Sequence, residues 1–63
     1  MKNLQTILNE NAEMVNDMKD GGSNWINSPL FTALMDYFAD EMPYGVQTGD
    51  EGLPEDWIAE RVS

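Results

Sequence analysis

Apolar positions between Ser28 and Met42 recur three, four and seven residues apart, the spacing of one face of an α-helix. Ser28 suits the N-cap, and Pro29 suits the first helical position, where no backbone N–H is needed. Pro43 follows the stripe and stops the helix. The pattern therefore predicts a helix over about 29–42. Its stripe is wide enough to touch neighbours on two sides and consists of Leu30, Phe31, Leu34, Met35, Tyr37, Phe38 and Met42.

A second stripe predicts an earlier helix over about 3–19, with Asn3 as its cap and Gly21 and Gly22 at its end. Some of its positions also follow the four-three spacing of a helix–helix seam with Asn11 as the polar member. Asn11 then either fixes register across a two-fold axis or lies at the stripe's edge in water. The apolar members are Leu4, Ile7, Leu8, Ala12, Met14, Val15 and Met18.

The connection between these helices, 23–27, is short, so the helices should be antiparallel or steeply crossed neighbours. It carries Trp25, for which two roles are open. The indole either closes one end of the core or anchors a partner, because tryptophan is common among binding hot spots.

The segment after Met42 is punctuated by glycine and proline and is not expected to form a regular helix. Residues 44–48 favour β-structure and predict one short strand, with Tyr44, Val46 and Thr48 on one face; an irregular loop is the alternative. Because no second strand is evident, the strand would pair with the same segment of a second copy.

Residues 54–62 predict a C-terminal helical turn or two, begun by Pro54. Trp57, Ile58 and Val62 would have to dock on the body to hold it. Otherwise the segment 49–63 is mobile and offers an aromatic, acidic motif to a partner.

The length of 63 residues allows one small domain, 1–63, with a limited core, and the chain has no cysteine or histidine for a disulfide or zinc staple. Oligomerisation remains, so the sequence predicts a mainly α, intertwined homodimer. Apolar surface left around Trp25, Met42 and Trp57 is the candidate groove for an amphipathic partner helix. The expected dimer or core residues are Leu4, Leu8, Val15, Phe31, Leu34, Met35 and Phe38.

Twelve acidic and three basic residues give a net charge of −9, which disfavours direct contact with nucleic acid or anionic lipid. The start of the chain lacks the continuous apolar run of a signal peptide or membrane span, so a cytoplasmic protein is expected. The carboxylates thicken toward the C-terminus. They either imitate DNA phosphates or serve solubility.

Candidate chemistry is sparse, because the absence of histidine and cysteine removes the commonest acid–base group, the thiol nucleophile and most transition-metal sites. Asp36 and Asp40 lie one helical turn apart, on the polar side of the predicted helix, with no pocket evident around them. The acidic loop residues Asp50, Glu51, Glu55 and Asp56 do not have the spacing of a calcium loop. A non-enzymatic protein without cofactor or metal is expected.

Three stretches, MKNLQTILNENAEMVNDMKDGG, SPLFTALMDYFADEMPYGVQTG and LPEDWIAERVS, together cover most of the chain. Over them the sequence resembles the 63-residue early proteins encoded between exo and xis in bacteriophage lambda and related temperate phages. The resemblance implies a dimer with two helices and one strand per chain, made early in infection, that favours lytic over lysogenic development. It implies no enzymatic activity and supplies no site residues.

Together these inferences predict a small acidic homodimer, in the cytoplasm of the infected bacterium, that biases phage development by binding a host or phage regulator. The alternative is an acidic DNA mimic that blocks a nucleic-acid-binding host protein.

Overall fold

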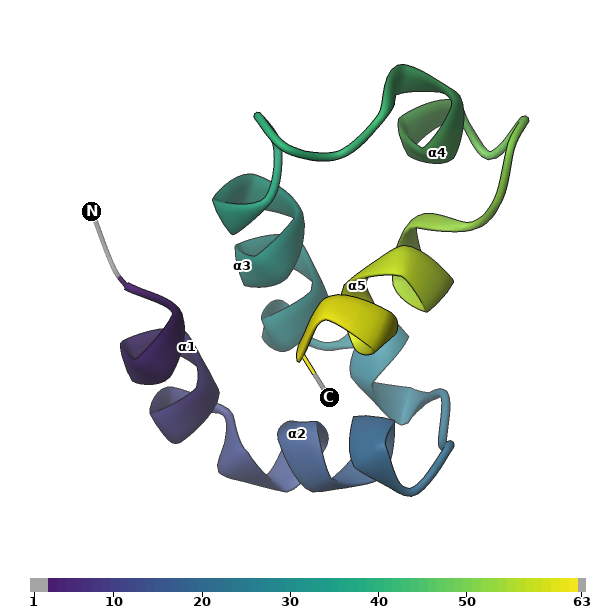
Figure 1. The fold of residues 1–63 in the computed structure, drawn as a ribbon. Helices are drawn as coiled ribbons and strands as arrows, with labels where there is room; N and C mark the ends of the chain where they lie inside the picture. Colours follow the sequence, from purple (N-terminus) through teal and green to yellow (C-terminus); the bar gives the residue numbers. More distant parts are fainter. Residues whose placement is uncertain (1–2, 63) are drawn as a thin grey trace.

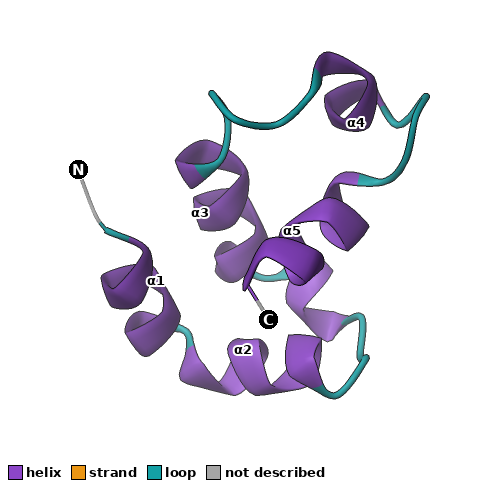
Figure 2. Ribbon diagram, viewed as in Figure 1, coloured by secondary structure: helices purple, strands orange, loops and turns teal. Residues whose placement is uncertain are grey.

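The computed structural model describes residues 3–62, and over that range the chain is built from helices without a strand (Figures 1 and 2). The expectation of a mainly helical fold is confirmed. In chain order the elements are α1 (Leu4–Glu10), α2 (Ala12–Lys19), the 3₁₀ helix η1 (Asn24–Asn27), α3 (Pro29–Tyr37), α4 (Tyr44–Thr48) and α5 (Pro54–Val62).

Helix α3 begins as the sequence predicts. The Ser28 hydroxyl accepts a hydrogen bond from the Leu30 N–H (3.3 Å) and donates one to the Trp25 carbonyl (2.6 Å), with Pro29 at the first helical position. The helix ends at Tyr37, earlier than expected, and 38–42 continues as turns. These turns carry the Met42 side chain into the core.

The predicted helix over 3–19 is wrong as a single element, because it breaks at Asn11. The backbone of Asn11 leaves the helical region (φ −127°, ψ 34°), and its side-chain amide donates to the Ile7 carbonyl (2.8 Å). Asparagine competes for backbone groups in this way and therefore interrupts helices. The break lets α1 pack against α3 while α2 packs against η1 (Figure 1).

The contact between α2 and η1 is fixed by Asp17. One carboxylate oxygen accepts from the Trp25 backbone N–H (3.0 Å), and the other accepts from the Asn24 side-chain amide (3.4 Å). Gly22 lies directly beneath this carboxylate, and a Cβ on Gly22 would overlap it. A side chain at position 22 would therefore displace the Asp17 carboxylate from the bonds that it accepts.

The predicted strand over 44–48 is wrong: these residues form α4. The N–H groups of Val46 and Gln47 both bond to the Pro43 carbonyl (3.0 Å each), which closes a helical turn. The Gln47 side chain also donates to the Met42 carbonyl (2.9 Å). β-Propensity is context-dependent, and here a single turn buries Val46 while these local bonds satisfy the backbone.

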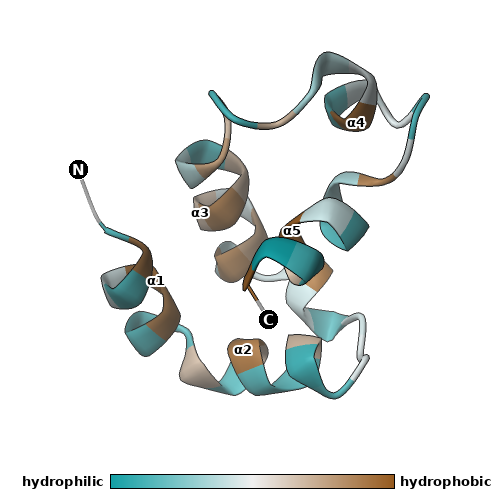
Figure 3. Cartoon of the chain, in the orientation of Figure 1, coloured by the Kyte–Doolittle hydropathy of each residue, from teal (hydrophilic) through white to brown (hydrophobic). Residues whose placement is uncertain are grey.

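Helix α5 packs against α3 and α4 through Ile58, whose side chain is fully buried, with Trp57 and Val62 partly buried beside it. Figure 3 shows the apolar parts of α1 and α2 facing the interior that α3 and α5 also border. Within residues 3–62 no polar side chain is buried. The buried residues are Ile7, Val15, Met18, Trp25, Leu30, Leu34, Phe38, Met42, Val46 and Ile58.

Candidate interaction surface

The residues expected in a core or dimer contact divide into two groups in the structure. Three of them, Val15, Leu34 and Phe38, are buried within the single chain. The remaining four are only partly buried and lie on the two helices that pack together, α1 and α3. These four are Leu4, Leu8, Phe31 and Met35.

The candidate groove around Trp25, Met42 and Trp57 is not an open surface. Trp25 is 3% exposed and Met42 is 4% exposed, so both side chains serve the core. The Trp25 ring meets Phe31 with centroids 5.7 Å apart, and its backbone N–H is held by Asp17. Burial of these side chains is favoured over exposure in a groove, because a small core gains most stability from removing its largest apolar side chains from water. Only Trp57 keeps a partly exposed ring.

Aromatic rings form a continuous row from the end of α3 to α5. Phe38 makes edge-to-face contacts with Tyr37 (5.0 Å between centroids) and with Trp57 (5.4 Å). The Arg61 guanidinium lies over the Trp57 ring, 4.6 Å from its centroid. The row therefore runs from the exposed Tyr37 through the buried Phe38 to the partly exposed Trp57, and it ends at the Arg61 guanidinium.

Exposed large apolar side chains are concentrated in the same part of the chain. Tyr37 is 40% exposed, Leu53 is 49% exposed and Tyr44 is 80% exposed. We call residues 36–62 the acidic half, because eight of the twelve acidic residues lie there and Arg61 is its one basic residue. The eight are Asp36, Asp40, Glu41, Asp50, Glu51, Glu55, Asp56 and Glu60.

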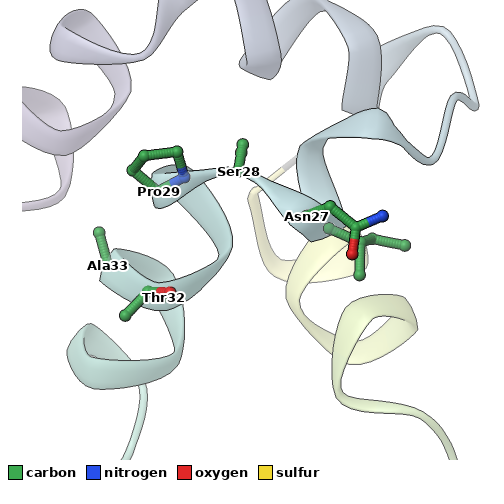
Figure 4. A pocket seen from close by; sticks show the side chains of 6 residues that line it. Asn27, Ser28, Pro29, Thr32 and Ala33 are labelled. Carbon is green, nitrogen blue, oxygen red and sulfur yellow. The ribbon is translucent and has the colours of Figure 1, made fainter.

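A shallow hollow of about 700 Å³ lies where η1 joins α3 (Figure 4). Figure 4 shows Asn27 on one side and Pro29, Thr32 and Ala33 on the other, with Ser28 between them. The Ser28 hydroxyl is engaged in capping α3, so it serves the fold. We call the hollow's lining, Ile26, Asn27, Ser28, Pro29, Thr32 and Ala33, the neutral surface.

The sequence carries a signal for the neutral surface that apolar periodicity does not reveal. The fifteen residues from Gly21 to Met35 include no charged side chain, although the chain has fifteen charged residues in total. Charge spacing, rather than hydrophobic spacing, singles out this segment.

Carboxylates in residues 3–62 form no group of three or more that could hold a metal ion. Asp36 and Asp40 are both exposed, as are Asp50, Glu51 and Asp56, while Glu55 is half-buried. In the same range no helix is long and apolar enough to cross a membrane.

Comparison of the chain with family models, curated proteins and solved structures gives no match.

Proposed function

We propose that this protein is a non-enzymatic interaction protein that acts as a homodimer and binds a host or phage regulator, favouring lytic over lysogenic development. The observation that carries the interaction role is the exposure of Tyr37, Tyr44 and Leu53 in the acidic half. Tyrosine presents a large, rigid contact area with a polar tip and is enriched at protein interfaces. The phage setting rests on the sequence resemblance.

We propose that two copies associate through the neutral surface and through the partly buried side chains that neighbour its residues in the sequence. Two chains of net charge −9 repel one another, and the repulsion is smallest where no charged group meets its copy. The uncharged stretch from Gly21 to Met35 meets this condition. It also contains partly buried apolar side chains that a second copy would cover, namely Ile26, Phe31, Ala33 and Met35.

The dimer is tested by sedimentation equilibrium of Thr32→Glu beside Thr48→Glu. Both threonines are exposed and helical, and each change adds one negative charge, but only Thr32 borders the neutral surface. We expect Thr32→Glu to weaken the dimer about tenfold or more relative to Thr48→Glu, because like charges then meet at the interface. Equal dissociation constants, or a compact wild-type monomer at micromolar concentration, would refute the assignment.

The functional proposal is tested by the frequency of lysogeny after infection. Phage carrying the double change Tyr37→Ser and Tyr44→Ser should form more lysogens than wild type, while the encoded protein still folds. Asp36→Asn with Asp40→Asn is the matched control, since an enzyme using these carboxylates would lose its effect on that change. Unaltered lysogeny with the tyrosine variant would count against an interaction through this half.

An acidic DNA mimic remains the second candidate, favoured by the eight acidic residues of the acidic half. Salt separates the two mechanisms. A mimic's complex should weaken steeply as ionic strength rises, whereas a contact made mainly by aromatic side chains should change little.

A further inference from the structure

The site that suggests a partner chemistry is the exposed face of Trp57 on α5. A small depression of about 330 Å³ is lined by Trp57, Glu60 and Arg61. The Arg61 guanidinium already lies over the indole at 4.6 Å. Cations are attracted to the negative face of an aromatic ring, and tryptophan binds them best. The Trp57 ring therefore holds a guanidinium in the free chain.

The charge around this ring favours a cation from outside the chain. Arg61 is the one basic residue after Lys19, whereas eight acidic residues lie between Asp36 and Glu60. Glu60 lines the depression itself and is exposed, and Asp56, directly before Trp57, is exposed as well. A carboxylate beside an aromatic face offers a guanidinium both a hydrogen-bonding partner and a stacking surface.

We propose that Trp57 and Glu60 form a recognition site for an arginine side chain of a basic partner segment, and that Arg61 occupies this site until the partner displaces it. The inference rests on the proposed interaction function and names the chemistry of its partner. Arg61 is exposed and sits in the last turn of α5, so its side chain can leave the ring without unfolding the helix. Phe38 supports the ring from the core side with an edge-to-face contact.

A comparison of arginine and lysine peptides of equal charge distinguishes binding at this site from nonspecific electrostatic attraction to the acidic surface. A short peptide alternating arginine and serine, and its lysine counterpart, are titrated into the full-length protein at physiological salt. Backbone amide resonances of α5 in NMR spectra report binding in every variant. The indole N–H resonance of Trp57, assigned by its loss in Trp57→Leu, reports contact with the ring itself. We expect the arginine peptide to bind about two- to fivefold more tightly than the lysine peptide.

Two variants of matched charge test the displacement of Arg61. Arg61→Gln and Lys19→Gln each remove one positive charge, but Lys19 lies at the end of α2, in another element. We expect Arg61→Gln to raise the affinity for the arginine peptide by at least about twofold more than Lys19→Gln, because it also vacates the ring. Trp57→Leu should abolish the preference for arginine over lysine while leaving the salt-dependent part of binding.

These measurements support or reject the arginine site, provided that circular dichroism shows each variant to be folded. The proposal is overturned by equal affinities for the two peptides, by equal effects of Arg61→Gln and Lys19→Gln, or by absence of binding. Such a result leaves the interaction function standing if the tyrosine double variant still alters lysogeny. The reverse pair of results would retain the arginine site and reject the proposed function.

Discussion

The two halves of this chain are stabilised by different means. In residues 3–35, large side chains such as Trp25 and Leu30 are buried, and the Asp17 carboxylate ties α2 to η1 by accepting two hydrogen bonds. In the acidic half, short elements are joined by turns, and Tyr37, Tyr44 and Leu53 remain exposed. The two halves share one hydrophobic core, to which Phe38 and Ile58 of the acidic half belong.

Under the proposed interaction function, the side chains that remain exposed in the acidic half would serve binding. Binding surfaces need apolar side chains that folding leaves in water, and these are concentrated after Asp36. A small domain has few such side chains to spare, and the large apolar side chains of residues 3–35 are all at least partly buried. The following changes ask how far the two halves depend on one another.

The largest effect is expected in the core that the two halves share. Phe38→Ala removes a buried ring that contacts both Tyr37 and Trp57, and should lower the free energy of unfolding by about 3–5 kcal/mol. For a chain of this size that loss is enough to prevent stable folding. Thermal unfolding followed by circular dichroism measures it, with Phe38→Leu as the milder control. Melting close to wild type for the alanine variant would show that the halves do not depend on this ring.

Within the first half, the Asp17 carboxylate joins α2 to η1 through side-chain hydrogen bonds. Asp17→Ala leaves the Trp25 N–H without its acceptor and should cost about 1–3 kcal/mol in urea unfolding. Asp20→Ala removes the same charge from an exposed position at the end of α2 and should stay within about 0.5 kcal/mol. If the two variants unfold at the same urea concentration, the hydrogen bonds that Asp17 accepts add nothing to the free energy of unfolding beyond the effect of its charge.

The same contrast explains which elements the sequence could predict. The start of α3 was predictable because its causes are local: a capping hydroxyl at Ser28 and a proline at the next position. The helix over 44–48 was not, because five residues carry too little pattern, and their conformation depends on burying Val46 and on the bonds of Gln47 to the Met42 and Ala39 carbonyls. The break at Asn11 is an intermediate case. Its cause, the bond of the Asn11 side chain to the Ile7 carbonyl, is local, but the apolar stripe continues across Asn11 and predicts an unbroken helix.

Candidate site residues divide in the same way. Periodicity identified Val15, Leu34 and Phe38 as interior, but it could not tell which large side chains a small core would leave exposed. Trp25 was left open between the core and a partner anchor, and Met42 was a candidate for the partner groove. Both lie inside, where the 3₁₀ helix η1 and the turns after α3 place them. Tyr44 was assigned to a strand face and is the most exposed of the large apolar side chains described.

Substitutions at two glycines of nearly equal φ, one in each half, test whether the two halves unfold together. Gly21 follows α2 at φ +84°, Gly49 follows α4 at φ +86°, and an added Cβ would contact nothing within 4 Å at either site. Gly21→Ala and Gly49→Ala should therefore each cost about 1 kcal/mol through backbone strain alone. Equal shifts in urea unfolding are expected if the chain unfolds as one unit. A shift for Gly21→Ala alone, with faster amide exchange in α4 of Gly49→Ala, would mean that the acidic half opens separately.

The smallest effect is expected at the most exposed ring. Tyr44→Ser should change the free energy of unfolding by less than about 0.5 kcal/mol, because the side chain is 80% exposed. Tyr37→Ser, which also removes an edge-to-face contact with Phe38, should cost about 0.5–1.5 kcal/mol. Thermal melting of the two variants tests this order, and a larger loss at Tyr44 would place that ring in the fold. If the order holds, folding does not require Tyr44, and a loss of partner binding in Tyr44→Ser reports the contact itself.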